Sequence, residues 1–233
     1  MAGFIFYQGP SQFDKAPIVG IATIESKNRK TGNMIQTWIL RQDISPLEAV
    51  MNGMDSSICG DCKFRNGICY VAVHQAPLNI WKSYKKHSYK KYTTPYLFAN
   101  KLVRFGAYGD CVAIPIKVWR NILSVAKGHT CYTHAWQQTI AQPYKEFSMA
   151  SVDNEAEAIQ AREMGWKTFR VKKADEEKLS LETICPASRK DLSKLVTCEK
   201  CLLCTGDKRN IVEDIHGLPF KIKNYSRLSL TTV

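Results

Sequence analysis

The sequence contains no apolar run long enough to form a transmembrane helix. Its start, MAGFIFYQGPSQFDK, lacks both the basic region and the apolar stretch of a signal peptide. It also has no low-complexity tract and no visible internal repeat. These absences argue against membrane, secreted and fibrous proteins. They predict a globular cytoplasmic chain with no membrane partner.

Acidic residues are scarce relative to basic ones: 21 Asp and Glu stand against 33 Lys and Arg, so the net charge is +12. Such a surplus favours polyanionic partners such as nucleic acid. Residues 81–92, WKSYKKHSYKKY, interleave lysines, which neutralise phosphates, with aromatic rings, which stack on unpaired bases. The alternative is a solvated basic surface with tyrosines packed beneath it. The candidate nucleic-acid-binding residues are Lys82, Lys85, Lys86, Lys90 and Lys91.

The chain has nine cysteines, an odd number that does not suit a disulfide framework and, in a reducing compartment, favours metal binding. Four of them follow the spacing C-x12-C-x2-C-x2-C, with a proline after the remote cysteine. This spacing is typical of cubane iron–sulfur clusters, whereas structural zinc usually takes two pairs of ligands. We therefore predict a 4Fe-4S cluster, with zinc as the alternative. The ligands of this C-terminal cysteine group are Cys185, Cys198, Cys201 and Cys204.

Three more cysteines follow the pattern C-x2-C-x6-C and are also predicted to bind a metal centre. A fourth ligand is supplied by His74, Cys111 or Cys131, or by no residue, which leaves one iron of a cubane open. With His74 the set also suits a Cys₃His zinc site. Cys111 and Cys131 are better explained as buried apolar residues. The N-terminal cysteine group consists of Cys59, Cys62 and Cys69.

The order of expected elements predicts an α/β fold. Residues 1–95 contain a long-looped hairpin (16–24 and 34–40), a helix capped by Ser45 and Glu48, and the N-terminal cysteine group. Residues 96–233 alternate short strands with helices, which implies parallel βαβ units. We expect an incomplete (β/α) barrel or a compact parallel sheet, with cysteine-rich metal-binding loops. The two parts are expected to form one integrated domain.

Polar residues follow several of these expected strands. Because ligands bind at the carboxyl ends of parallel strands, such residues are predicted to share a cleft, where they bind substrate or move protons. Each also has a structural explanation as a turn residue, a helix cap or a core histidine. The candidate catalytic residues are Asp110, His134, Asp153 and His216.

A resemblance rests on the motifs CGDC…CYV, YGD, YTHAW, CPAS…CEKCLLCTG and IHG. They resemble those of a family encoded by tailed phages and plasmids whose members carry only gene-product numbers. The family is loosely similar to radical S-adenosylmethionine barrels in its cysteine cluster and parallel strands. The resemblance implies a phage origin and the cytoplasm of an infected bacterial host. However, the C-x2-C-x6-C spacing differs from the C-x3-C-x2-C of radical enzymes, and no glycine-rich methionine-binding strand is evident.

Three functions are consistent with these observations. The first is an iron–sulfur enzyme of radical or redox type, with one or two 4Fe-4S clusters and S-adenosylmethionine as a possible cofactor. The second is a basic nucleic-acid-binding protein with structural iron–sulfur or zinc sites. The third is a phage factor that binds a host protein and uses metal only for stability.

Overall fold

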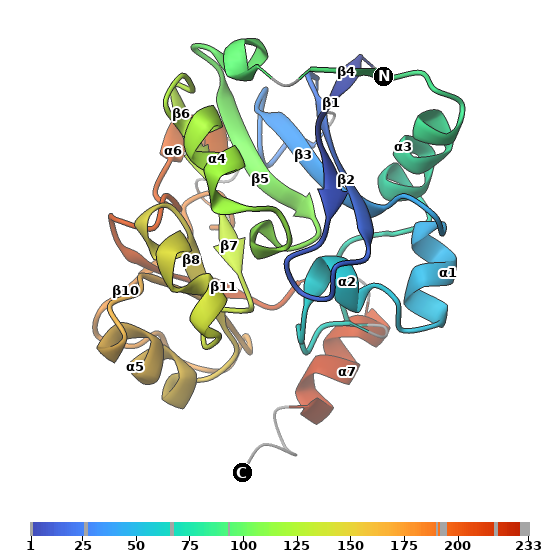
Figure 1. Cartoon of the computed structure of the whole chain (residues 1–233). Coiled ribbons are helices and arrows are strands. Elements are labelled where there is room, and N and C mark those ends of the chain that lie inside the picture. Colours follow the sequence, from blue (N-terminus) through green and yellow to red (C-terminus); the bar gives the residue numbers. More distant parts are fainter. Residues whose placement is uncertain are drawn as a thin grey trace.

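Two β-sheets rich in parallel strands form the framework of the protein (Figure 1). The computed structural model describes residues 2–25, 28–65, 68–92, 94–189, 191, 195–216 and 219–228. The six-stranded sheet has the order β4-β1-β2-β3-β5-β6, and the five-stranded sheet has the order β10-β11-β9-β8-β7. The strands of the first sheet are β1 (Gly3–Pro10), β2 (Pro17–Thr23), β3 (Ile35–Arg41), β4 (Lys90–Lys91), β5 (Leu102–Tyr108) and β6 (Gly128–Thr130). Those of the second are β7 (Tyr132–Thr133), β8 (Met149–Val152), β9 (Thr168–Lys172), β10 (Glu182–Ile184) and β11 (Asn210–Asp214).

Helices are distributed along the whole chain, and most are short. The short helix α2 and the single turn α6 both begin or end at cysteines of the two groups. The α-helices are α1 (Pro46–Met51), α2 (Ser56–Cys59), α3 (Ala76–Lys85), α4 (Ile116–Leu123), α5 (Glu155–Glu163), α6 (Cys198–Cys201) and α7 (Pro219–Leu228). The 3-10 helices are η1 (Pro95–Phe98), η2 (Cys111–Ala113) and η3 (Thr139–Glu146).

Parallel pairing connects most of the strands. β3 pairs with β5 and β5 with β6 in parallel, and every pairing within the second sheet is parallel. The two sheets meet around Cys131, between β6 and β7, where its N–H donates to the carbonyl of Cys204 and its carbonyl accepts from Met149. The α/β class and the parallel strands of the second half are therefore confirmed. An incomplete barrel stays a prediction.

The first part of the chain forms largely the elements that its local signals predict. β2 and β3 make an antiparallel hairpin, with Ile18 opposite Arg41 and Thr23 opposite Gln36. α1 starts at a capping box in which the Glu48 N–H donates to Ser45 Oγ and the Ser45 N–H donates to the Glu48 carboxylate. Strand β1, which the sequence analysis did not single out, pairs antiparallel with β2 and extends the sheet.

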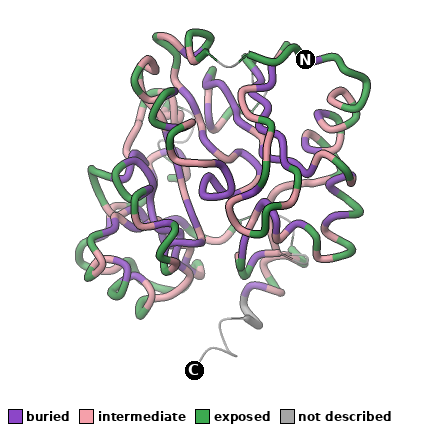
Figure 2. Tube along the Cα trace, in the orientation of Figure 1, coloured by how far each residue is buried: buried purple, intermediate pink, exposed green. Residues whose placement is uncertain are grey.

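The core lies along the strands, where most of the buried residues, purple in Figure 2, are found. Trp119 and Trp166 are among the largest fully buried side chains. Cys111 and Cys131 are completely buried in the same core, which agrees with their interpretation as small apolar residues. Across the described residues, none of the helices has the length and apolarity needed to cross a membrane.

Two glycines shape the end of β5, where Asp110 follows. Gly106 and Gly109 both have positive φ angles, at 63° and 85°, which side chains other than glycine rarely adopt. A Cβ on Gly109 would lie 2.7 Å from the Cβ of Ile39, so β5 can turn under β3 only because this residue is glycine. The Asp110 N–H then donates to the carbonyl of Ile58 at 2.6 Å. This turn brings Asp110 next to the segment that carries the N-terminal cysteine group.

Candidate functional site

One cavity of about 370 Å³ contains both cysteine groups in its wall. Its volume is within the range of small-molecule sites. The two groups lie more than 100 residues apart in the chain, and they follow strands of different sheets, β3 of the first and β10 of the second. The cysteines that line the cavity are Cys59, Cys62, Cys69, Cys185, Cys198, Cys201 and Cys204.

Neighbouring parallel strands each contribute side chains to the cavity wall. Since successive residues of a strand point to opposite faces, the wall receives alternate residues, as with Phe169 and Val171 of β9. The lining residues from the other strands are Arg104, Gly106, Ala107 and Tyr108 of β5, Thr130 of β6, Tyr132 of β7, Ser151 of β8, and Ile211 and Glu213 of β11. The cavity therefore lies on one face of the parallel strands.

The loop of the N-terminal cysteine group is held by Arg65. Its guanidinium donates to the Asp55 carboxylate at 2.7 and 2.9 Å and to the carbonyls of Gly53 and Gly60 at 2.6 and 3.1 Å. Further along the loop, the Cys69 N–H donates to the carbonyl of Phe64 at 2.6 Å. These bonds fix the backbone on both sides of Cys62 without using any of the three thiols.

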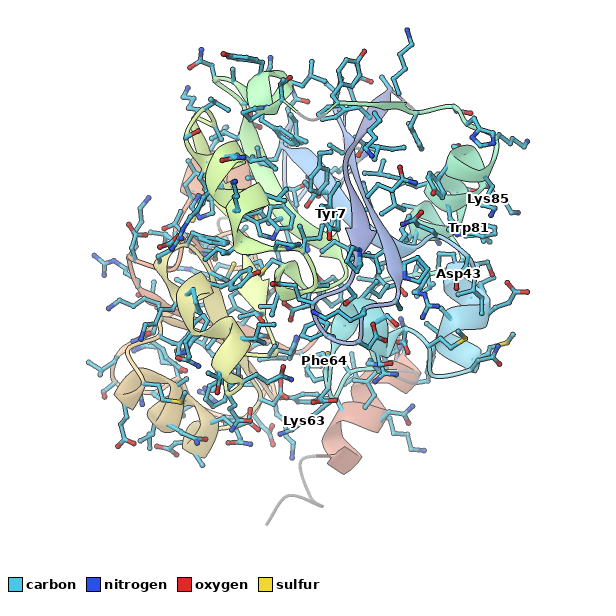
Figure 3. The ribbon with its side chains drawn as sticks, in the orientation of Figure 1. Tyr7, Asp43, Lys63, Phe64, Trp81 and Lys85 are labelled. Carbon is cyan, nitrogen blue, oxygen red and sulfur yellow. The ribbon has the colours of Figure 1, made fainter. Side chains whose placement is uncertain are left out.

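The same loop is also tied to the distant helix α7. Lys221 donates to the carbonyl of Cys69, and the Tyr225 ring makes an edge contact with Phe64 at 5.7 Å between centroids. The Tyr225 hydroxyl lies 2.7 Å from the carbonyl oxygen of Val171, at the end of β9. Figure 3 shows Phe64 and Lys63 at the end of the molecule where α7 packs. α7 thus connects the loop of the N-terminal cysteine group to the ends of the parallel strands.

The C-terminal cysteine group is held by loops nearer to the first sheet. The N–H of Cys198 donates to the carbonyl of Lys30 at 2.8 Å, so the turn α6 packs on the connection between β2 and β3. The Cys185 N–H donates to Val212 of β11 at 2.8 Å, and the Cys204 carbonyl accepts from Cys131 at 3.0 Å. The four thiols therefore come from two separate segments, and both segments line the cavity.

All seven lining thiols are free of disulfide bonds. Within the described part of the chain, no three His, Cys, Asp or Glu side chains come close enough together to hold a single metal ion. Burial raises the pKa of Cys62 to about 12 and also raises the pKa of Cys198. A bound metal would offset this cost, because it stabilises the thiolate form.

Two residues near the N-terminal cysteine group carry unpaired polar atoms. The Tyr108 hydroxyl and His134 Nε2 are buried and have no hydrogen-bond partner among the described residues. Both residues line the cavity. Burial also lowers the pKa of His134 to about 4, so its ring is neutral near pH 7. Unpaired buried polar atoms are uncommon in proteins and are costly, so they mark this part of the structure as unusual.

Asp110 lines the cavity, but its carboxylate is occupied by bonds that shape the site. It accepts from the Thr133 hydroxyl at 3.0 Å, from the N–H of His134 at 2.8 Å and from the N–H of Val112 at 3.0 Å. Burial raises the pKa of Asp110, and these hydrogen bonds oppose that rise. Asp110 is therefore well placed to hold the loop that presents His134.

Asp153 differs from the other candidate catalytic residues because it is absent from the cavity wall. One of its carboxylate oxygens is buried without a partner, and burial together with Glu157 raises its pKa to about 7. Glu157 also pairs with Lys63 of the N-terminal cysteine loop. Asp153 thus lies close enough to affect Cys62, whose pKa its charge raises.

His216 stands at an exposed position of the cavity wall. Its side chain is 57% exposed, its Nδ1 lies 3.3 Å from Glu213, and its ring lies over Tyr70 with centroids 6.2 Å apart. Glu213 is buried and also pairs with Lys30. The structure therefore brings Asp110, His134 and His216 to one cavity with the cysteines.

Arg104 is a site residue that the sequence analysis missed. It projects into the cavity from the middle of β5, and its Nη2 donates to the Tyr70 hydroxyl at 2.7 Å. Its charge opposes the burial that raises the pKa of Cys198. A charged residue inside the otherwise apolar strand LVRFGAY was the available signal. By contrast, Arg170 forms a buried ion pair with Glu182 at 2.7 Å, which explains it structurally.

The five candidate nucleic-acid-binding lysines are exposed on α3, the turn after it and β4, and none of them lines the cavity. The aromatic residues between them are mostly packed. Trp81 donates to the carbonyl of Arg41, and Lys85 lies over its ring (Figure 3). Tyr84 donates to Gln42, and Tyr89 is buried. This arrangement favours a basic surface with packed aromatics, and nucleic-acid binding stays a prediction.

His74, which was considered as a fourth ligand, does not line the cavity, and neither do Cys111 and Cys131. Comparisons with protein-family models, curated proteins and solved structures found no match. The resemblance to the phage and plasmid family therefore stays a prediction, as do the host-protein partner and the location in an infected cell.

Proposed function

We propose that this protein is an iron–sulfur enzyme whose reaction takes place in the cavity between the two cysteine groups. The observation that carries the proposal is that seven unpaired cysteines from separate segments line one cavity together with Asp110, His134 and His216. A purely structural metal site has no need of an adjoining cavity of this size.

The arrangement of the thiols favours a cluster over a single zinc ion. Zinc requires all four ligands within about 2.3 Å of one centre. A cubane binds its ligands at separate iron corners, so its thiols stand farther apart. The sequence spacing C-x12-C-x2-C-x2-C, with a proline after Cys185, supports a cluster of this kind.

The two groups suit different roles. The C-terminal cysteine group has four thiols, enough to complete the coordination of a 4Fe-4S cluster. The N-terminal cysteine group has three, and none of the residues considered as its fourth ligand lines the cavity. A cluster held there would have one iron without a cysteine ligand, which would supply an exchangeable position for a small molecule. Neutral His134 would then be available as a hydrogen-bonding group rather than as a charge.

The test is anaerobic purification followed by iron and sulfide counts and by electron paramagnetic resonance of the reduced protein. We expect two clusters, with the signal of one altered by a small molecule that binds its open iron. S-adenosylmethionine is the first molecule to add, because a change in the spectrum on its addition would distinguish a radical enzyme from a redox enzyme. Stoichiometric zinc without sulfide, or clusters whose spectra do not respond to any added ligand, would contradict an enzyme of this type.

A further inference from the structure

Arg104 introduces a positive charge into the cavity wall, and no carboxylate of the described residues pairs with it. Its guanidinium makes one hydrogen bond, to the neutral Tyr70 hydroxyl, and the groups that act on its charge are Tyr70, Tyr132 and Cys198. The other charged residues of the wall are matched: Lys30 pairs with Glu213, and Asp110 accepts three hydrogen bonds. A partly buried charge without a partner is costly, so its presence indicates a role.

The position of Arg104 lies between the two cysteine groups. Through its hydrogen bond it contacts Tyr70, which directly follows Cys69. Its charge acts on Cys198 of the other group. A guanidinium offers five N–H donors in a fixed fork, and one donor group is used by Tyr70. The remaining fork is suited to carboxylate or phosphate oxygens.

The surroundings of Arg104 are mainly apolar. Tyr132 and Phe169 pack edge to face with centroids 4.8 Å apart, and Phe64, Val71 and Ile211 complete much of the wall. Such walls bury the carbon skeleton of a ligand, while a few polar groups orient it. A bare inorganic ion would leave these surfaces without a partner.

We propose that the cavity binds a small organic oxyanion, a carboxylate or a phosphate ester with an apolar body, whose charged group is held by Arg104. The proposal deepens the proposed function and rests on it for the chemistry that follows binding. The binding step itself can be measured separately.

The test measures the binding of three probes to the full-length, anaerobically purified protein by isothermal titration calorimetry. Benzoate carries a carboxylate on an apolar ring, phenyl phosphate carries a phosphate on the same ring, and benzyl alcohol is a neutral control. We expect at least one of the two anions to bind, and the stronger one identifies the preferred head group. Benzyl alcohol binding as tightly as both anions would overturn the oxyanion assignment, and so would a failure of both anions to bind at about 10 mM.

Arg104→Gln is expected to weaken binding of the anion by about tenfold or more, because it removes a charge-assisted hydrogen bond. Arg120→Gln is the matched control, since Arg120 lies 55% exposed on α4, pairs with Glu146 and is absent from the cavity wall. It removes the same charge from the protein and should change the affinity less than twofold. Unchanged affinity in Arg104→Gln would overturn the proposal and leave Arg104 as a counter-charge for Cys198.

Circular dichroism checks that each variant is folded. If Arg104→Gln does not fold, the test uses Arg104→Lys, which keeps the positive charge but lacks the two parallel N–H donors of the guanidinium. We expect it to weaken binding of the anion by about threefold or more. Iron and sulfide counts on the same preparations separate this inference from the proposed function. Loss of anion binding at full metal content supports the site, whereas Arg104-dependent binding in a protein that never holds metal would contradict only the enzyme proposal.

Discussion

The two cysteine groups lie in one cavity but differ in the charges around them. Near the N-terminal cysteine group, carboxylates add to the effect of burial: Asp55 and Asp110 raise the pKa of Cys59, and Asp153 raises that of Cys62, whereas Lys221 lowers that of Cys69. Near the C-terminal cysteine group, cations oppose burial: Arg104 and Lys30 lower the pKa of Cys198, and Lys208 lowers that of Cys201.

This difference bears on the kind of metal centre that each group can stabilise. A centre with four thiolate ligands carries more negative charge, and neighbouring cations favour it. An acidic surround disfavours additional negative charge and therefore favours a centre with fewer thiolates. The electrostatics agree with the proposed function, in which the C-terminal group holds a closed cluster and the N-terminal group holds an open one.

The largest expected effect is the loss of a whole centre. Cys204→Ala should lower the iron and sulfide content by one cluster and lower the free energy of unfolding by about 4 kcal/mol, because metal binding and folding are coupled. Cys62→Ala should remove the other cluster and the response to added ligand. Cys111→Ala, in the core away from the cavity, is the control and should retain full iron. A single mutation that removes both centres would contradict their independence.

The next effect concerns the acidic surround and depends on pH. Burial together with Glu157 raises the pKa of Asp153 from its ordinary 3.8 to about 7 in the folded protein. Between about pH 4 and pH 7 the carboxyl is therefore protonated in the folded state and ionised in the unfolded state. Stability contributed by Asp153 is therefore present at low pH and is lost as pH rises through this window. Asp153→Asn should stabilise the protein by about 2 to 4 kcal/mol at pH 8 and by little near pH 4.

The measurement is urea unfolding of both proteins across this pH range. His134 changes stability in the opposite direction, because its pKa is lowered from 6.5 to about 4 and its neutral form is favoured by folding. Its contribution is lost as pH falls through that window. Because both proteins contain His134, its contribution cancels when the free energy of unfolding of the wild type is subtracted from that of the Asp153→Asn variant. A difference that does not change with pH would show that Asp153 ionises normally.

A smaller effect on stability should distinguish the two cysteine groups, because α7 packs against the loop of the N-terminal group. Tyr225→Phe removes the hydroxyl that donates to Val171 and should cost about 1 kcal/mol. Hydrogen exchange should speed up at residues 59–65 and stay unchanged at residues 198–204, since α7 contacts the first segment. Tyr96→Phe, at a position 75% exposed, is the matched control. Equal changes in both segments would indicate global destabilisation instead.

The smallest effect tests the cationic surround. Lys208→Gln removes one of the charges that lower the pKa of Cys201 and should speed iron loss from the C-terminal cluster to a chelator about twofold. Lys82→Gln, on α3 and outside the cavity wall, should leave this rate unchanged. If both variants release iron at the same rate at low salt, Lys208 does not influence the cluster.

Local signals in the sequence predicted what depends on a few neighbouring residues. The capping box at Ser45 and the alternation of strands and helices led to α1 and to the parallel strands, and the strand-end rule placed Asp110 and His134 at one site. Arg104 could not be assigned in this way, because which face of β5 points inward depends on its register with β3 and β6. α7 was missed because PFKIKNYSRL has a weak apolar pattern, and its position depends on distant contacts.

The contacts of α7 also have a consequence for biosynthesis. Lys221 and Cys69 lie 152 residues apart in the chain, and α7 is translated after every described element that it contacts. The side of the site next to Cys69 therefore stays uncovered on the ribosome after the strands of the wall have emerged. Iron delivered during this interval would reach the N-terminal cysteine group before α7 packs against its loop.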